Sequence, residues 1–206
     1  MILYDYFRSS AAYRVRIALN LKGVAYARRD IMLLENQQRS PEHLARNPQG
    51  FVPALEADGK VITQSLAIIE WLDARHPEPR LIPPDPDARA AAMARALVVA
   101  ADTHPLNNLR VMRRLKEMGV DEDGRNAWTR HWIAEGFAAL EAMAGEGPFL
   151  GGGAPGIADL CLVPQMYNAR RFATPLDDFP RLVAIDAAAT ALPAFAAAHP
   201  DAVAPK

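Results

Sequence analysis

Cysteine is nearly absent from this sequence, since Cys161 is the only one in 206 residues. A single cysteine excludes an internal disulfide and a metal site built from several thiolates. The five histidines are scattered and form no His-x-x-x-His pair of the kind that binds zinc on a helix. Cys161 lies in the apolar run 160–163, which favours a small core residue over a nucleophile. No metal site is predicted.

No sign of charge dominates either: 23 Lys and Arg stand against 24 Asp and Glu, for a net charge of -1. General binders of nucleic acid or of anionic membranes carry a basic excess, so neither partner is expected. The sequence lacks an apolar run of about 18 residues. Residues 2–6 resemble a strand directly after Met1, rather than the basic and apolar regions of a secretory signal. A cytoplasmic location is therefore expected.

Residues 1–75 alternate between segments typical of strands and of helices. The predicted order is βαβαββα, with strands at residues 2–6 and 24–31, a hairpin of residues 52–57 and 60–63, and helices over residues 11–22, from 41 and from 65. Gly23 is expected to end the first helix, Ser40 to cap the second and Ser65 to cap the third. This order predicts a small α/β domain.

Five prolines lie between His76 and Asp87, a density that neither helix nor strand tolerates, so this segment is the predicted domain boundary. Beyond it the pattern is helical: a long Ala-rich helix over residues 87–118, an amphipathic one over 125–144 and an apolar one over 157–172. We therefore expect an α/β domain at residues 1–80 and an all-α domain at residues 88–206.

The turn before the first helix carries two hydroxyls, Ser9 and Ser10. Free N–H groups and the positive end of the helix dipole make such a position favourable for an anion. Taken alone, this motif is more simply explained by Ser9 or Ser10 acting as an ordinary helix N-cap.

A second candidate site lies at Asn47–Pro53, just before the hairpin. Pro53 cannot donate a hydrogen bond within a sheet, and a cis bond before it would turn the Val52 backbone outward to pair with an extended ligand. An ordinary proline turn is the alternative. Gln64 and Ser65 open the next helix, whose N-terminus suits a carboxylate or is again simply capped.

These segments together resemble the zeta-class glutathione transferases, the maleylacetoacetate and maleylpyruvate isomerases. The similar segments are spread in order along the chain: residues 9–19 (SSAAYRVRIAL), 47–55 (NPQGFVPAL), 64–70 (QSLAIIE), 104–110 (HPLNNLR) and 164–172 (PQMYNARRF). The resemblance implies a thioredoxin-like N-terminal domain, a helical C-terminal domain and a homodimer.

The resemblance also implies that glutathione is the cofactor. By this resemblance the Ser9 hydroxyl hydrogen-bonds the glutathione sulfur, which favours the thiolate over the thiol. The Val52 backbone binds the cysteinyl unit, and Gln64 and Ser65 hold the γ-glutamyl end. The other implied glutathione-binding residues are Ser10, Ala11, Gln49, His104, Asn108 and Arg110. Because His104 and Asn108 are four residues apart, they are expected to share a helix face.

The implied reaction is cis–trans isomerisation of a diacid whose double bond is conjugated with carbonyls. Thiolate addition leaves a single bond that can rotate, and elimination then gives the trans product. Developing enolate charge and the carboxylates require cations. Arg8 and Arg171 are the candidates, with Arg170 as a further neighbour. The arginine pair also fits a solvated helix C-terminus.

Two positions depart from the family pattern: many zeta members have cysteine at the position of Ala11, and related transferases have Ser or Thr at the position of Gly156. The Ala11 difference and the arginine pair favour maleylpyruvate slightly over maleylacetoacetate. One alternative is a transferase that conjugates glutathione to electrophiles such as α-haloacids. A non-catalytic binding protein is less favoured, because Ser9, Gln64 and Ser65 are all present.

Overall fold

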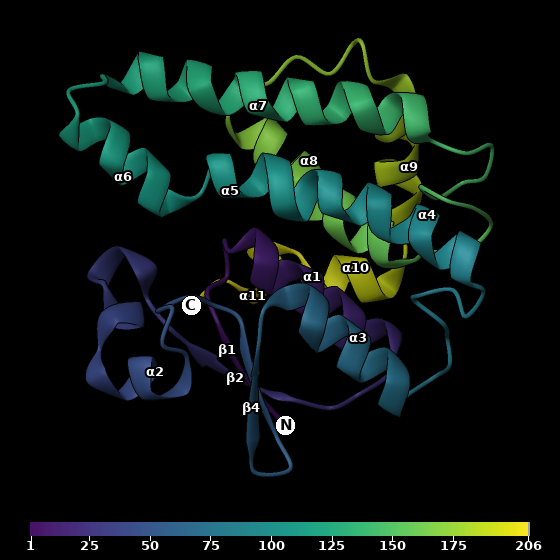
Figure 1. The fold of residues 1–206 in the computed structure, drawn as a ribbon, viewed down its shortest axis with the longest axis horizontal. Helices are drawn as coiled ribbons and strands as arrows, with labels where there is room; N and C mark the ends of the chain where they lie inside the picture. Colours follow the sequence, from purple (N-terminus) through teal and green to yellow (C-terminus); the bar gives the residue numbers. More distant parts are fainter. Residues whose placement is uncertain (206) are drawn as a thin grey trace. The chain divides into compact units, whose positions relative to one another are not determined.

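The computed structural model describes residues 1–205, which divide into two compact units (Figure 1). Unit 1 comprises Met1–Leu81 together with the C-terminal segment from Ala191 on, and unit 2 comprises Ile82–Thr190. Unit 1 combines a sheet with helices, whereas the described elements of unit 2 are helical.

Unit 1 contains a four-stranded mixed sheet in the order β2-β1-β3-β4. β1 pairs in parallel with β2, and β3 pairs antiparallel with both β1 and β4. The elements follow one another as β1 (Ile2–Asp5), α1 (Ser10–Leu21), β2 (Ala27–Asp30), two short 3-10 turns (Leu33–Glu35 and Gln37–Arg39), α2 (Pro41–Arg46), β3 (Ala54–Ala57), β4 (Lys60–Thr63) and α3 (Ser65–Arg75). The predicted βαβαββα order is confirmed.

Local sequence signals set several of these boundaries. Gly23 follows α1 with a φ of 62°, a left-handed conformation that glycine adopts without a steric penalty. Asp58 and Gly59 both have positive φ, 51° and 72°, as a two-residue hairpin turn requires. The Ser40 hydroxyl caps α2 by accepting a hydrogen bond from the His43 N–H group at 3.2 Å. These predicted turns and caps are confirmed.

The C-terminal segment belongs to unit 1 because it binds α1. It contains α10 (Pro193–Ala198) and α11 (Pro200–Val203). The buried Arg16 guanidinium donates from Nη1 to both carboxylate oxygens of Asp5, at 2.8 and 2.9 Å, and from Nε to the Ala198 carbonyl at 3.0 Å. The sequence predicts domains at residues 1–80 and 88–206, and this division remains a prediction. The compact units differ from it, because residues 191–205 belong to unit 1.

Unit 2 is helical in the part of the chain described. Its elements are α4 (Pro86–Leu97), a π-helical turn (Val98–Thr103), α5 (His104–Leu106), α6 (Leu109–Glu117), α7 (Glu122–Met143), α8 (Ile157–Arg171) and α9 (Pro180–Thr190). The expectation of one long helix over residues 87–118 is wrong. The helix widens at Val98–Thr103, where the Thr103 hydroxyl bonds the Val98 carbonyl at 2.9 Å, and it ends before Asn107.

Close packing accompanies this irregular turn. A Cβ atom placed on Gly136 of α7 would lie 2.1 Å from the Thr103 Oγ1 atom. Glycine is therefore required for α7 to approach the π-helical turn this closely.

The start of α8 depends on Asp159, which is 2% exposed. Its carboxylate accepts hydrogen bonds from the N–H groups of Gly156 and Leu150, at 2.9 and 2.7 Å. Gly156 has no hydroxyl to complete a reciprocal capping pair, so Asp159 is the side chain that caps this end. Burial raises the pKa of the Asp159 carboxyl.

Replacement of Asp159 by alanine is expected to lower the free energy of unfolding by about 3 kcal/mol, because the N–H groups of Leu150 and Gly156 lose their hydrogen-bond acceptor. Since burial raises the folded-state pKa, this carboxyl contributes most below its unfolded pKa, and its contribution declines as pH rises through the folded value. Urea unfolding at several pH values measures both effects. The matched control is Asp121→Ala, because Asp121 caps α7 from an exposed position and its loss is expected to cost about 1 kcal/mol. Equal losses would contradict the role given to Asp159.

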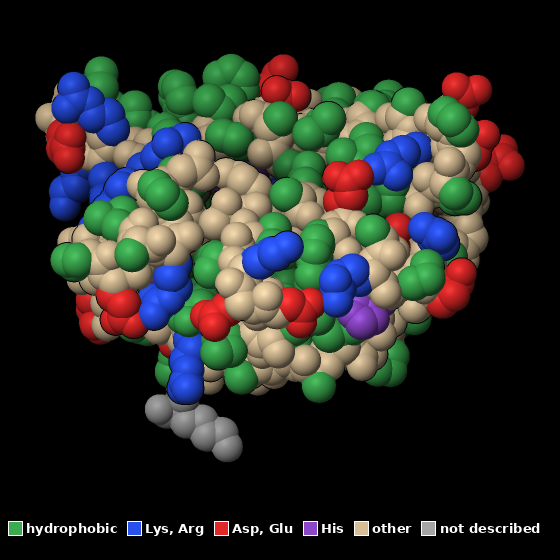
Figure 2. Space-filling model, turned by 60° about the horizontal axis from the view of Figure 1, so that its bottom comes forward, with side chains coloured by type: hydrophobic (Ala, Val, Ile, Leu, Met, Phe, Trp, Pro, Cys, Tyr) green, Lys and Arg blue, Asp and Glu red, His purple; other side chains and the backbone are tan. Residues whose placement is uncertain are grey.

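The surface carries side chains of both charges, and the single cysteine lies in the core. On the face drawn in Figure 2, basic, acidic and hydrophobic side chains are interspersed. Cys161 is fully buried, as expected of a core residue. Within residues 1–205, no helix combines the length and the apolar composition needed to cross a bilayer.

Candidate functional site

The register of the sheet brings the turn after β1 close to the segment before β3. In the antiparallel pairing of these strands Tyr4, near the end of β1, lies opposite Ala54, the first residue of β3, so the chain leaves β1 toward Ser9 at the edge where Val52 leads into β3. The Ser9 N–H group donates to the Tyr6 carbonyl at 2.8 Å, which closes the turn before α1. Ser9 and Val52 therefore lie at the same edge of the sheet.

The β3–β4 pairing brings a third segment to this edge. Ala54 also lies opposite Thr63, the last residue of β4, so Gln64 and Ser65 follow β4 at this same edge. α1 and α3 consequently begin at one edge of the sheet, and they pack side by side (Figure 1). Both helices therefore direct the positive ends of their dipoles toward this edge.

Ser9, and not Ser10, is the N-cap of α1. Its backbone is extended, with φ -71° and ψ 116°, and its hydroxyl oxygen accepts from the Ala12 N–H group at 3.2 Å. Because this bond uses a lone pair of the oxygen, the hydroxyl proton stays available to a second partner. Ser10 is buried in the first turn, and Ala11 is partly exposed beside it. The cap and the anion site predicted at this turn are thus compatible.

Hydrogen bonds to the residue before Val52 fix the loop that leads into β3. The Phe51 carbonyl interacts with His43 Nε2 at 2.8 Å and accepts from Asn47 Nδ2 at 3.0 Å. The Val52–Pro53 peptide bond is cis. In residues 1–205, neither the N–H nor the carbonyl of Val52 bonds to another group of the chain, so both are available to an extended ligand.

The start of α3 differs from the sequence prediction, since Ser65 is not its cap. Gln64 is the N-cap, and Ser65 is the first helical residue and is buried. Gln64 has a φ of 69°, a conformation that costs a non-glycine residue about 1–3 kcal/mol and is concentrated at ligand sites. Its side-chain amide donates to Gln49 Oε1 at 2.6 Å, which joins this helix start to the exposed loop residue predicted to bind glutathione.

Two of the predicted residues of unit 2 are placed differently from the expectation. His104 begins α5, whereas Asn108 lies outside it as the N-cap of α6, so they do not share a helix face. The chain turns at Asn107 and Asn108, and the Asn108 side chain accepts from the N–H of Arg110 at 3.1 Å. The prediction of a shared face was wrong because a spacing of four residues gives a shared face only in an unbroken helix. Arg110 is exposed in the first turn of α6.

The three candidate arginines have different surroundings. Arg170 forms an ion pair with the buried Asp186 at 2.7 Å. Arg171, the last residue of α8, donates to Asn168 Oδ1 at 3.4 Å. Arg8 is exposed beside Ser9, with its guanidinium 4.9 Å from the centre of the Phe7 ring. No carboxylate of residues 1–205 pairs with Arg8 or Arg171, which leaves these two cations available to an anionic ligand.

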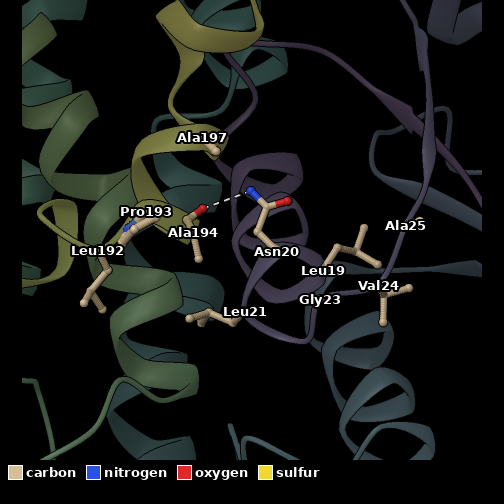
Figure 3. Close-up of a pocket in the computed structure, with 10 residues that line it drawn as sticks. All are labelled: Leu19, Asn20, Leu21, Gly23, Val24, Ala25, Leu192, Pro193, Ala194 and Ala197. Carbon is tan, nitrogen blue, oxygen red and sulfur yellow. Dashed lines mark hydrogen bonds between the residues drawn. The ribbon is translucent and has the colours of Figure 1, made fainter.

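A cavity of about 640 Å³ in unit 1 lies at the C-terminal end of α1 (Figure 3). It is lined mainly by apolar residues from the C-terminal end of α1, the following loop and α10, and the Asn20 side chain crosses to the Ala194 carbonyl at 2.9 Å. α1 is 12 residues long, or roughly 18 Å, and Ser9 lies at its other end. The cavity is therefore not the candidate site.

Comparison with known proteins agrees with the sequence motifs. The glutathione S-transferase N-terminal domain matches residues 1–74. The chain is 50% identical to a maleylacetoacetate isomerase of Rhizobium meliloti, over 97% of this chain and 96% of the relative. It is 44% identical to a maleylpyruvate isomerase of Ralstonia sp, over 97% of each. The chain belongs to the zeta-class glutathione transferases.

Solved structures of this class confirm the fold of this zeta-class chain. The holo structure of a bacterial maleyl pyruvate isomerase matches it with a TM-score of 0.97 and 43% identity, over 99% of both chains. A maleylacetoacetate isomerase from Anaeromyxobacter dehalogenans, solved with glutathione in its active site, matches with a TM-score of 0.89 and 48% identity, over 98% and 96% of the chains. The thioredoxin-like N-terminal region and the helical region predicted from sequence are confirmed.

The edge of the sheet in this zeta-class chain fits glutathione chemically. A hydroxyl at a helix N-terminus, as at Ser9 and Ser65, suits an anion such as a thiolate or a carboxylate, and a backbone N–H and carbonyl outside a strand, as at Val52, suit an extended peptide. The residue that sequence reasoning missed is Arg14, whose guanidinium donates to Ser65 Oγ at 3.2 Å. The signal was a charged residue between apolar ones in the first helix.

Proposed function

We propose that this chain is a glutathione-dependent cis–trans isomerase of maleylpyruvate or maleylacetoacetate, acting in the breakdown of aromatic compounds. The observation that carries the proposal is that the segments holding Ser9, Val52 and Ser65 adjoin β1, β3 and β4 at the same edge of the sheet. The near-full-length identity to isomerases of both names supports the reaction class. Ala11 favours maleylpyruvate slightly, as does the arginine pair at the end of α8.

The proposed role of Ser9 is to hold a thiolate. Its oxygen is fixed by the Ala12 N–H group, so its proton points away from the helix and can be donated to sulfur. The N-terminus of α1 adds a positive potential at the same point, and both effects favour the ionised form. When bound, glutathione supplies a thiolate that adds reversibly to the double bond, so that the bond can rotate before the trans isomer is released.

The remaining glutathione-binding roles follow the two ends of the tripeptide. The Val52 backbone is proposed to bind the cysteinyl unit, and Gln64 and Ser65 the γ-glutamyl end, with Gln49 fixing Gln64. Ser10 and Ala11 are proposed to shape the turn around the sulfur. In unit 2, the proposed contributors to glutathione binding are His104, Asn108 and Arg110.

Arg8 and Arg171 are the proposed ligands of the substrate's carboxylates and of enolate charge. A guanidinium can donate two parallel hydrogen bonds to a carboxylate, which fixes the orientation of the diacid. Arg170 is a weaker candidate, because Asp186 already occupies it. We further propose a homodimer located in the cytoplasm, the compartment in which glutathione keeps thiols reduced.

The test is the absorbance of the enol-diketone band of maleylpyruvate and of maleylacetoacetate, followed with and without glutathione. Decay that requires both the protein and glutathione is expected, and the faster substrate identifies the pathway. Absence of decay with either substrate, together with conjugation of an α-haloacid, would replace the isomerase by the transferase alternative. Absence of both reactions, with glutathione still bound, would leave a binding protein.

A further inference from the structure

The first helix of unit 1 carries a buried cation that none of the proposed roles uses. Arg14 is 2% exposed and lies between the apolar neighbours Tyr13 and Val15. Its Nη1 atom donates to the Ser65 hydroxyl oxygen at 3.2 Å, across the contact between α1 and α3. Burying a guanidinium costs free energy that its hydrogen bonds must offset, and the bond to Ser65 Oγ at the start of α3 is one of them.

We propose that Arg14 is a positioning residue for Ser65, and through it a determinant of specificity for the carboxylate of the γ-glutamyl group. This inference rests on the proposed function, because it assumes that glutathione binds at this edge of the sheet. A guanidinium has donors only, so the Ser65 oxygen must accept from it. The hydroxyl proton then has to point elsewhere, and Ser65 becomes a donor to a ligand at the N-terminus of α3.

The same arrangement occurs at the other helix start of the site. Ser9 accepts from the Ala12 N–H group and keeps its proton for the sulfur, whereas Ser65 accepts from Arg14 and keeps its proton for a carboxylate. An oriented donor is worth more than a rotating one, because no rotamer or competing bond has to be given up on binding. The positive charge of Arg14 also lies on the protein side of this hydroxyl, which strengthens its bond to an anion.

The experiment compares glutathione with 4-aminobutanoyl-cysteinyl-glycine, which lacks only the γ-glutamyl carboxylate, by titration calorimetry. In Arg14→Met the Kd for glutathione is expected to rise about 10-fold, the usual loss for one charge-assisted hydrogen bond. The Kd for the analogue is expected to change less than 2-fold, and Arg14→Lys is expected to restore part of the glutathione affinity. In the Ser65→Ala background, Arg14→Met is expected to add no further loss.

The matched control is Arg16→Lys, since Arg16 is buried in the same helix but binds Asp5 and backbone carbonyls instead of Ser65. Arg16→Lys is expected to lower the stability of the protein and to change the Kd for glutathione and the Kd for the analogue by the same factor. Equal losses for glutathione and the analogue, or additive losses in the Ser65→Ala background, would overturn the role of Arg14. Should Arg14→Met fail to fold, the same comparison in Arg14→Lys decides. A wild-type chain that does not bind glutathione would instead refute the proposed function.

Discussion

Ser9→Ala is expected to lower kcat/KM for isomerisation about 30-fold near pH 7, and far less near pH 9. A free thiol with a pKa of about 8.5 is roughly 3% ionised at pH 7 but mostly ionised at pH 9. If Ser9 and the N-terminus of α1 keep the bound thiol ionised, losing the hydroxyl removes most of the thiolate only at the lower pH. Initial rates across this range, with ultraviolet titration of the bound thiolate, measure both quantities.

Two smaller effects of this substitution oppose each other. The more basic thiolate left in the variant is the better nucleophile, with a Brønsted coefficient of about 0.4–0.5, which restores part of the rate. The sulfur also loses a hydrogen bond that orients it, and misorientation lowers the rate at every pH. The net expectation therefore remains close to the change in thiolate population.

The control for Ser9 is another capping serine. Ser40 caps α2 by accepting from the His43 N–H group at 3.2 Å, the same distance that joins Ser9 to Ala12. Ser40→Ala is expected to cost about 1 kcal/mol of stability and to leave the pH profile of catalysis unchanged. A deficit in Ser9→Ala that stays constant from pH 7 to pH 9 would contradict a role in thiol ionisation.

Most of the first unit could be predicted because its signals are local. Helix stops, caps and the two-residue hairpin depend on neighbouring residues, and they appear where Gly23, Ser40 and Asp58-Gly59 predict them. The π-helical turn at Val98–Thr103 could not be predicted, because it packs against Gly136, which is distant in sequence. Pro105, just after this turn, is a local signal against a continuous helix, and the prediction of one helix over residues 87–118 did not use it.

The candidate site divides in the same way. Ser9 could be assigned from its position before a helix and from family resemblance, and its cap geometry agrees. The Arg14–Ser65 bond joins residues 51 positions apart, so no spacing rule predicts it. The difference between Arg170 and Arg171 also required the structure, since only Arg170 is held by Asp186. Local chemistry was readable from sequence, whereas the partners that orient it were not.

Arg171→Ala is expected to lower kcat/KM for maleylpyruvate about 100-fold, the loss of about 3 kcal/mol for an unpaired charge partner. For an uncharged aryl halide, conjugated to glutathione by the same thiolate, the expected change is less than about 3-fold. Arg8→Ala is expected to show the same selectivity. Because both reactions use Ser9 and glutathione, their ratio within each variant cancels errors in folding, active fraction and thiol ionisation.

The control is Arg114→Ala, which removes one positive charge from an exposed position on α6 where Arg114 pairs with Glu117 at 3.1 Å. It is expected to leave the rates of both reactions unchanged. This result would show that the loss in Arg171→Ala comes from a direct contact with the diacid and not from the change in net charge. Raising the ionic strength should reduce only the long-range part. A larger selective loss in Arg170→Ala than in Arg171→Ala would exchange their assignments, since the diacid would then have to displace Asp186 from Arg170. Equal losses for the diacid and the uncharged electrophile would contradict carboxylate recognition by either arginine.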